Sequence, residues 1–357
     1  MSLSALNPPG IGGYDLMSPA DRILMFDYTR SGAADHFLLY RPGTGKIYIL
    51  HNTRGTFTPV YKAETGGIGG YDLADPADQI FAFDYDSSGY TDHLVLYRPG
   101  AGKISILKNT GGVFTAVYSQ ETGGIGGFDL SSPVDHAFAY DFDNSGLLNH
   151  LVFYRPGQRM IWILSNNGGN FQLVFGAIPG TGIAGYDLAS PADLGFALDY
   201  VQYPATPNAL ALYRPGKGAF YIIVPRDGVF IAAYAQGDPG SGIGQYDLKE
   251  PQDRAFAFDY ESTGFLSYIV LYRPGRGAIF ILRQEGPDSF SYNRVYDQGD
   301  PGSGIAGYDL ADPNDQVMAC DYLGTGKDDH LCLYRPGTGI FWIVEMNGGS
   351  PAGVYPG

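Results

Sequence analysis

Short apolar stretches recur along the whole chain, and glycine, proline, serine or aspartate bounds each of them. Residues 80–120 contain four such stretches: "IFAFDYD" (80–86), "HLVLYR" (93–98), "KISILKN" (103–109) and "FTAVYSQ" (114–120). Alternation of large and small or apolar and polar residues with a period of two predicts β-strands, and the turn residues predict short connections. No stretch shows a 3.6-residue period, so the pattern predicts an all-β chain.

This group of four stretches occurs six times. An apolar strand precedes "YRPG" in every copy, and the arginine of this turn stands at positions 41, 98, 155, 214, 273 and 335. "GYDL" or a variant of it recurs in step, beginning at 13, 70, 127, 185, 245 and 307. Four short antiparallel strands in each unit of a fixed-period repeat predict a β-propeller with six four-stranded blades.

The repeats extend over nearly the whole chain. We expect one domain over residues 1–357, with repeats at about 11–67, 68–124, 125–182, 183–242, 243–304 and 305–357. Joining the tail "GVYPG" to the head "NPPGIGGYDL" regenerates an inter-repeat junction, so we expect six blades with adjacent termini. Pairs such as Phe138/Ala139 and Phe196/Ala197 predict that a bulky ring faces a small residue across each blade interface.

Charge and composition exclude several classes of partner. The net charge of −15 argues against nucleic acid, which proteins bind mainly through clustered Lys and Arg. No apolar run approaches the ~20 residues that span a bilayer, so we expect no membrane insertion. The start "MSLSALNPPG" lacks the features of a signal peptide, so we expect synthesis in the cytoplasm and release by a non-classical route or by cell lysis. Apolar residues replace Cys320 and Cys332 in other repeats, which predicts buried free thiols.

One unit is "GIGGYDLADPADQIFAFDYDSSGYTDHLVLYRPGAGKISILKNTGGVFTAVY". It resembles the repeat of the bacterial fucose-binding β-propeller lectins of the Photorhabdus lectin (PLL/PHL) type, and the resemblance covers nearly the whole chain. It implies multivalent binding of fucose or fucosylated glycans on host glycoconjugates, through several shallow sites per ring. It also implies oligomerisation, no cofactor and no catalysis. The members have seven blades, so seven is the alternative to the six counted here.

One position inside the third strand is aromatic in five of the six repeats. The residues at this position are Tyr48, Ser105, Trp162, Tyr221, Phe280 and Trp342. Its neighbours, such as Ile161 and Ile163, stay apolar, so the middle side chain is expected to point to the other, partly exposed face. Exposed rings can stack on the apolar C–H face of a pyranose. Two interpretations stay open: these rings bind sugar, or they pack against the next blade.

The aspartates of "YDL" and "PxD" and the turn arginines occur in all six repeats. We interpret them first as structural, because aspartates cap turn amides and an arginine fork ties a carboxylate bidentately. Spare arginine donors could also serve a sugar hydroxyl. The candidate sugar-binding set therefore comprises the five aromatic residues above and Arg41, Arg155, Arg214, Arg273 and Arg335.

"DYDSSGYTD" (84–92) has the spacing of a calcium loop, with Asp84, Asp86, Ser88 and Asp92 as oxygen ligands. The other repeats lose most of these ligands, so we interpret the loop as a hydrogen-bonded turn and expect no metal site. Histidines begin the second strand in four repeats, at His36, His93, His150 and His330. No partner lies at metal-ligand spacing, so we interpret them as strand-edge hydrogen-bonding residues.

The sequence therefore predicts a multivalent lectin. Two rival functions are a protein-interaction scaffold or toxin-associated module, and a propeller glycosidase. A glycosidase needs a few carboxylates at defined separation. The acidic residues here repeat with the blades and show no unique cluster, so we do not expect an enzyme.

Overall fold

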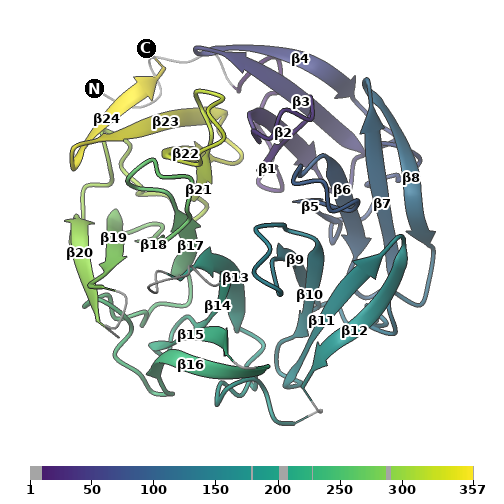
Figure 1. The fold of residues 1–357 in the computed structure, drawn as a ribbon. Helices are drawn as coiled ribbons and strands as arrows, with labels where there is room; N and C mark the ends of the chain where they lie inside the picture. The colour runs from purple at the N-terminus through teal and green to yellow at the C-terminus, as the bar shows by residue number, and fades with distance from the viewer. Residues whose placement is uncertain (1–9, 178–179, 201–207, 227, 287–290, 357) are drawn as a thin grey trace.

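The computed structural model describes residues 10–177, 180–200, 208–226, 228–286 and 291–356. These residues form six four-stranded antiparallel sheets, arranged as blades around a common axis (Figure 1). The prediction of a six-bladed β-propeller is confirmed, and the seven-bladed alternative is wrong. Within the described ranges, no helix is long and apolar enough to cross a membrane.

Four consecutive strands build each blade, and their bounds follow. Blades 1 to 3 contain β1 (Arg22–Phe26), β2 (His36–Arg41), β3 (Lys46–Thr53), β4 (Thr56–Ala63), β5 (Gln79–Phe83), β6 (His93–Arg98), β7 (Lys103–Thr110), β8 (Val113–Gln120), β9 (His136–Tyr140), β10 (His150–Arg155), β11 (Met160–Asn167) and β12 (Asn170–Gly176). Blades 4 to 6 contain β13 (Leu194–Asp199), β14 (Asn208–Arg214), β15 (Ala219–Arg226), β16 (Val229–Gln236), β17 (Arg254–Phe258), β18 (Tyr268–Arg273), β19 (Ala278–Gln284), β20 (Tyr292–Asp297), β21 (Gln316–Cys320), β22 (His330–Arg335), β23 (Ile340–Asn347) and β24 (Ser350–Tyr355).

The ring closes through loops and not through a shared sheet, because every blade takes its four strands from one repeat. The amides of Gly43 and Gly45, in the turn after β2, donate to the Leu73 carbonyl of the next repeat (both 3.0 Å). The amides of Gly337 and Gly339 donate in the same way to Leu16 (2.9 and 3.2 Å). Blades 6 and 1 are therefore joined like the others, and the two ends of the described chain meet, as predicted.

Each hydrophobic core cluster lies between two neighbouring blades. Phe138 of blade 3 shares a cluster with Ala197 of blade 4, and Phe256 of blade 5 shares one with Ala319 of blade 6. The predicted pairing of large and small side chains across the interface is confirmed. Since neighbours cover both faces of a blade, second strands such as β6 are buried almost throughout.

The tyrosine of the repeated "YRPG" turn links each blade to the next. The hydroxyl of Tyr97 accepts a hydrogen bond from the Ala137 amide (3.0 Å), and that of Tyr154 accepts one from Gly195 (3.1 Å). Tyr40, Tyr213 and Tyr272 accept from Ile80, Ala255 and Val317 in the same way. The tyrosine therefore satisfies an amide of the next blade's innermost strand that would otherwise be unpaired.

Both cysteines lie in the innermost part of blade 6, Cys320 on β21 and Cys332 on β22. Both are fully buried and not disulfide-bonded, which confirms the predicted free thiols. Burial raises the pKa of each thiol well above its usual range, so both are held in the unreactive protonated form.

Candidate functional site

Every repeat places one arginine, two aspartates and one aromatic residue together beside a blade interface. In repeat 4, Arg214 at the end of β14 donates from Nε to Asp193 Oδ1 (2.7 Å) and from Nη2 to Asp193 Oδ2 (3.0 Å). Its Nη2 also donates to Asp187 Oδ1 (2.5 Å). The Tyr186 hydroxyl donates to Asp193 Oδ1 (2.6 Å), and the Ser190 amide donates to Asp193 Oδ2 (3.0 Å). The fully buried Asp193 is therefore satisfied on both oxygens.

The other repeats build the same cluster from equivalent residues. Each arginine binds its "PxD" aspartate through Nε and Nη2 and its "YDL" aspartate through Nη2 in the sets Arg41–Asp21–Asp15, Arg98–Asp78–Asp72, Arg155–Asp135–Asp129, Arg273–Asp253–Asp247 and Arg335–Asp315–Asp309. The structural role expected for these residues accounts for most arginine donors. The proposed contact of the arginines with sugar stays a prediction.

The "YDL" aspartate is the water-accessible member of the cluster, and in repeat 4 the Asp187 side chain is 51% exposed. Burial opposes its ionisation, but hydrogen bonds from Arg214 and the Ala189 amide outweigh burial and lower the pKa of Asp187. Burial, followed by the charge of Asp193, raises the pKa of Tyr186, so the phenol stays protonated. Each cluster thus holds a charged acceptor at its rim in a fixed orientation.

The aromatic position of the third strand lies beside this cluster. In every repeat that has an aromatic residue there, the ring packs edge-to-face on the ring of the "YDL" motif. The centroid distances are 5.2 Å for Tyr48–Tyr14, 5.8 Å for Trp162–Phe128, 5.1 Å for Tyr221–Tyr186, 5.0 Å for Phe280–Tyr246 and 6.4 Å for Trp342–Tyr308. The structure therefore brings the predicted arginines and aromatic residues together within each repeat.

Exposure separates the third-strand residues into two groups. Trp162, Tyr221 and Trp342 remain partly exposed. Tyr48 and Phe280 are only 1% and 6% exposed, so the expectation of an open ring is wrong for them. The physical reason is that neighbouring chain covers both faces of each blade, so the face opposite the apolar flanks is not automatically solvent-facing.

Small hollows open beside the clusters of repeats 4 and 5. The first has a volume of about 120 Å³ and is lined by Tyr186, Asp187, Arg214, Tyr221 and Asp238, among others. The second has a volume of about 180 Å³ and is lined by Gln245, Tyr246, Asp247, Arg273, Phe280 and Asp300. Each combines an aromatic wall with carboxylates and a guanidinium, which suits a small polyhydroxylated ligand.

Sequence reasoning missed the two junction aspartates of these hollows. Arg214 donates from Nη1 to Asp238 Oδ2 (2.8 Å), and Arg273 binds Asp300 through the same atom. No described residue accepts a hydrogen bond from Nη1 of Arg41, Arg155 or Arg335. A signal was present in the sequence, because only the junctions after repeats 4 and 5 read "QGDPGSG", at 236–242 and 298–304.

Repeats 1 and 2 close the equivalent place with polar side chains. In repeat 1 the Tyr48 hydroxyl donates to Glu64, and Lys62 Nζ lies 4.9 Å from the centre of the Tyr48 ring. In repeat 2 the hydroxyl of Ser105, which is only 5% exposed, lies 3.1 Å from that of Ser119. These repeats offer no open aromatic wall at the third-strand position.

The loops with calcium-like spacing are hydrogen-bonded turns. Both oxygens of Asp84 accept backbone amides, from Ser88 (2.9 Å) and Gly89 (2.8 Å), and the equivalent Asp27, Asp141, Asp259 and Asp321 do the same in their loops. The expected turn is therefore confirmed for these five repeats. The equivalent loop of repeat 4 includes 201–207, which lie outside the described residues.

One group of side chains within the described ranges has metal-ligand spacing. Donor atoms of Asp86, Asp92 and His93 lie within 4.8 Å of one another. Arg30 already pairs with Asp86 (2.9 Å) and Asp92 (3.3 Å), which neutralises much of the charge a cation would need. Any ion bound there would have to displace Arg30.

The strand-edge histidines fall into two pairs. His36 and His330 hydrogen-bond through Nδ1 to the carboxylates of Asp35 and Asp329 (both 2.6 Å), as expected. His93 Nδ1 lies 2.7 Å from Asp92 Oδ1, but neither of these two atoms makes a hydrogen bond among the described residues. Nδ1 of His150 is buried and also finds no hydrogen-bond partner there. The expected hydrogen bond is therefore not formed at Nδ1 of these two residues.

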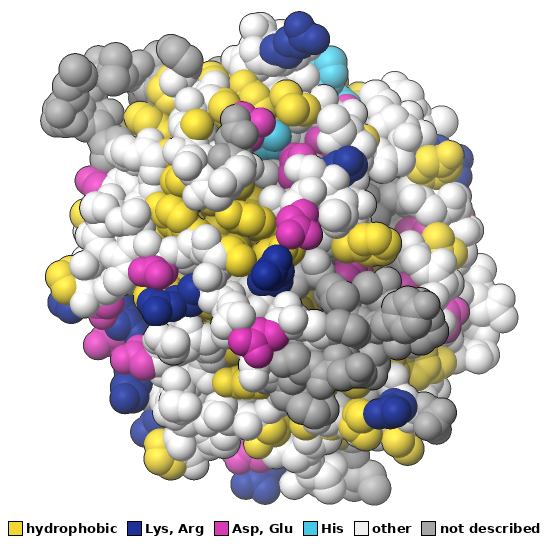
Figure 2. All heavy atoms as spheres, turned by 60° about the vertical axis from the view of Figure 1, so that its left-hand side comes forward, with side chains coloured by type: hydrophobic (Ala, Val, Ile, Leu, Met, Phe, Trp, Pro, Cys, Tyr) yellow, Lys and Arg dark blue, Asp and Glu magenta, His cyan; other side chains and the backbone are white. Residues whose placement is uncertain are grey.

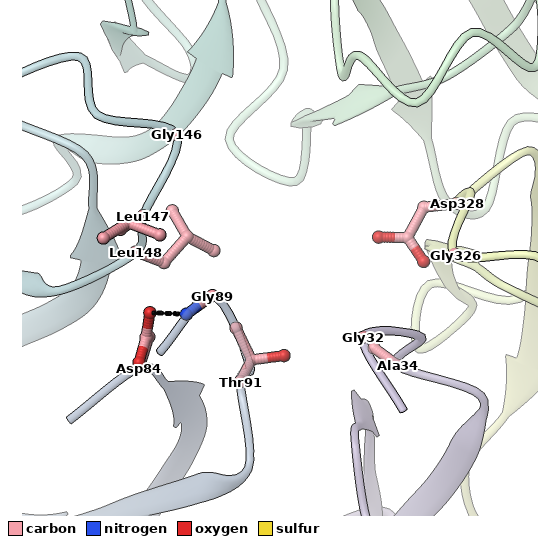
Figure 3. Close-up of a pocket in the computed structure, with 10 residues that line it drawn as sticks. All are labelled: Gly32, Ala34, Asp84, Gly89, Thr91, Gly146, Leu147, Leu148, Gly326 and Asp328. Atoms are coloured by element: carbon pink, nitrogen blue, oxygen red, sulfur yellow. Dashed lines mark hydrogen bonds between the residues drawn. The ribbon is translucent and has the colours of Figure 1, made fainter. Parts of the chain in front are cut away.

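A cavity of about 260 Å³ lies at the ring axis, lined by the loops before the second strands of blades 1, 2, 3 and 6. Figure 3 shows the Asp328 carboxylate directed into it, across from Leu147 and Leu148. Burial, followed by the charges of Asp321, Asp259 and Asp329, raises the pKa of Asp328 to about 7. Sequence reasoning missed this residue, because only the folded ring brings these loops together.

The chain matches no protein-family model, and no curated protein matches it in sequence. Its structure is similar to that of an Agrocybe aegerita lectin that specifically recognises non-reducing terminal N-acetylglucosamine (TM-score 0.55, 18% identity, 94% of this chain and 80% of that chain). It is also similar to proteins assigned as 6-phosphogluconolactonases from Bacteroides fragilis (0.47, 12%, 91% and 81%) and Bacteroides uniformis (0.46, 11%, 90% and 81%). At these identities the likeness shows the β-propeller fold alone.

The expectation that the protein is not an enzyme is corrected by these structures. Proteins assigned as lactonases, which are enzymes, stand beside a lectin among the similar structures. The expectation also rested on finding no cluster of carboxylates unique to one repeat, and Asp328 is a single carboxylate that the other described repeats lack. Ala34, Thr91, Leu148 and Leu266 hold its place in the other repeats described there. A carboxyl group with a raised pKa in a cavity is a feature that acid–base catalysis uses.

Proposed function

We propose that the protein binds carbohydrate through the clusters at its blade interfaces. The observation that carries the proposal is the hollow of repeat 4, where the partly exposed Tyr221 ring stands beside Asp187 and Asp238, whose side chains are 51% and 35% exposed. Sugar recognition needs an aromatic face for the pyranose C–H groups and fixed acceptors for its hydroxyls. The Agrocybe aegerita lectin of similar fold supports the same class of ligand.

Repeat 5 offers a second hollow with the equivalent carboxylates and guanidinium, although its Phe280 ring is only 6% exposed. Trp162 and Trp342 give repeats 3 and 6 a partly exposed aromatic wall. Several weak sites on one rigid ring raise the apparent affinity for a surface glycan by about 10²–10⁴ when their spacing fits. Fucose is the sugar implied by the sequence resemblance, and N-acetylglucosamine is the sugar recognised by the similar lectin. Both belong in the first test.

A glycan array with competition by free fucose and free N-acetylglucosamine tests the proposal. The expected result is a sugar-dependent signal that one of these monosaccharides suppresses and that Tyr221→Ala weakens. Tyr90→Ala is the matched control, because Tyr90 lies in the loop after β5, away from the clusters. Signal on no glycan would overturn the proposal and favour a protein-interaction scaffold.

A further inference from the structure

One position of the fourth strand breaks the sixfold pattern. Five blades carry an aromatic residue there, paired across the sheet with the end of the third strand: Phe57, Phe114, Phe171, Phe230 and Tyr292. Blade 6 has Pro351, which is paired with Met346. The exception matters because, in the other five blades, the aromatic side chain at this position reaches the preceding blade.

In the other five blades the ring fills the interface. It packs on an aromatic residue in the fourth strand of the preceding blade, at centroid distances of 5.2 Å (Phe57–Tyr355), 5.3 Å (Phe114–Tyr61), 5.2 Å (Phe171–Tyr118), 4.7 Å (Phe230–Phe175) and 5.7 Å (Tyr292–Tyr234). In each of these five pairs the planes of the two rings cross at 75° or more. This edge-to-face arrangement is favoured by the charge distribution of aromatic rings.

Phe114 and Phe171 also contact a second ring of the preceding blade, Tyr28 and Tyr85 respectively, at 6.3 Å. At the interface of blades 5 and 6, the corresponding rings are Tyr296 and Tyr260. Pro351 brings no ring to either of them. Blade 5 therefore keeps the two tyrosines of this aromatic contact, and blade 6 lacks the ring that would pack on them.

An open groove of about 610 Å³ lies at this interface, lined by Tyr260, Glu261, Ser262, Tyr268, Arg283, Val295, Met346, Gly348 and Gly349. Tyr260 and Tyr268 lie against each other, with centroids 5.0 Å apart and planes at 32°. Figure 2 views the molecule from the side of blades 5 and 6 and shows apolar side chains gathered on this face, with charged side chains nearby. The groove shares no residue with the clusters proposed to bind sugar.

We propose that this groove binds a small molecule that carries a single aromatic ring. Tyr260, which lines the groove, is the counterpart of Tyr28 and Tyr85, against which a phenylalanine ring packs at the equivalent interfaces. One wall of the groove therefore suits a benzene-sized ring. Glu261 and Arg283 lie 3.8 Å apart on the rim, each 53% exposed. They offer an acceptor and a donor to a neutral polar substituent such as a phenolic hydroxyl.

The direct test is titration of the full chain with p-cresol, the side-chain analogue of tyrosine, followed by calorimetry and ligand-observed NMR. One p-cresol per chain is expected to bind. Pro351→Phe restores the residue that the other blades use, so it is expected to fill the groove and weaken p-cresol binding at least tenfold. Pro59→Phe adds the same ring at an exposed position of β4 and is the matched control, with binding unchanged.

Pro351→Phe is also expected to melt at the same temperature as the unmodified chain or slightly above it, because it completes the sixth aromatic contact. Val295→Trp obstructs the groove from blade 5 and tests occupancy independently if Pro351→Phe does not fold. It too is expected to weaken p-cresol binding at least tenfold. Absence of p-cresol binding to the unmodified chain would overturn the proposal. The proposal would also be overturned if a folded Pro351→Phe or Val295→Trp variant bound p-cresol as tightly as the unmodified chain.

Discussion

Each turn arginine directs most of its donors to carboxylates of its own repeat. Arg155, for example, binds Asp135 through Nε and Nη2 and Asp129 through Nη2. The Asp135 side chain has no exposed surface, so its charge depends on these bonds for compensation. At the residue scale, the arginine occurs in all six repeats because each repeat buries an aspartate whose charge needs a partner.

Replacing Arg155 with methionine is expected to lower the free energy of unfolding by about 3–5 kcal/mol, because it leaves the buried Asp135 charge unpaired. Arg54→Met changes an exposed arginine and is expected to stay within about 0.5 kcal/mol. Urea unfolding of the two variants and the parent measures the difference. Equal stability of the two variants would show that the cluster contributes little.

The two tryptophans test whether the third-strand rings bind or only pack. Trp162→Ala and Trp342→Ala remove partly exposed rings, so each should cost less than the ~3–5 kcal/mol of a fully buried aromatic residue. Glycan binding should fall in each single variant and fall further in the double variant, because two sites are lost. Glycan binding and thermal melting are measured on the same samples. Unchanged binding with a collapsed melting temperature would assign both rings to the core.

At the scale of the elements, the sequence predicted the positions of the strands closely. It predicted the candidate site only in part. The expected strand at 93–98 coincides with β6, and the one at 103–109 differs from β7 by one residue, because alternation and turn residues are local signals. Local patterns do not report what a neighbouring blade covers. For that reason Phe280 was expected to be open and is buried, and Asp328 was missed.

The loops before the second strands give a prediction about metal removal. EDTA is expected to change the melting temperature by less than about 2 °C and to leave glycan binding intact. Backbone amides donate to both oxygens of the Asp84 carboxylate and of its equivalents in four other loops, so these loops are held without a cation. Melting curves with EDTA and with added calcium make the comparison. A drop of ten degrees or more with EDTA would mean that these loops hold a structural cation.

At the scale of the whole molecule, closing the ring brings together acidic loops that are far apart in the sequence. Asp259 and Asp328 belong to different blades, yet the Asp259 amide donates to the Asp328 carbonyl (3.3 Å). A second axial cavity of about 440 Å³ is lined by Asp141, Asp199, Asp259 and Asp328. With a net charge of −15 and several carboxylates at the axis, the folded ring carries an electrostatic cost that the unfolded chain avoids.

Asp328 makes that cost measurable. Its folded-state pKa of about 7 lies above the unfolded value of about 3.9, so the folded chain binds this proton more tightly. The contribution of Asp328 to stability is therefore greatest below the unfolded pKa and is lost as pH rises towards the folded value, with no further loss above about pH 8.

Asp328→Asn replaces the titratable carboxyl group with a neutral amide. It is expected to stabilise the protein by about 1–2 kcal/mol more at pH 8 than at pH 5, since water in the cavity screens part of the repulsion. Asp312→Asn changes a partly exposed turn aspartate and should show no such difference. The test is to measure the free energy of unfolding of the parent and both variants at pH 5 and pH 8. If Asp328→Asn raised this free energy equally at the two pH values, repulsion between the axial carboxylates would not be the cause.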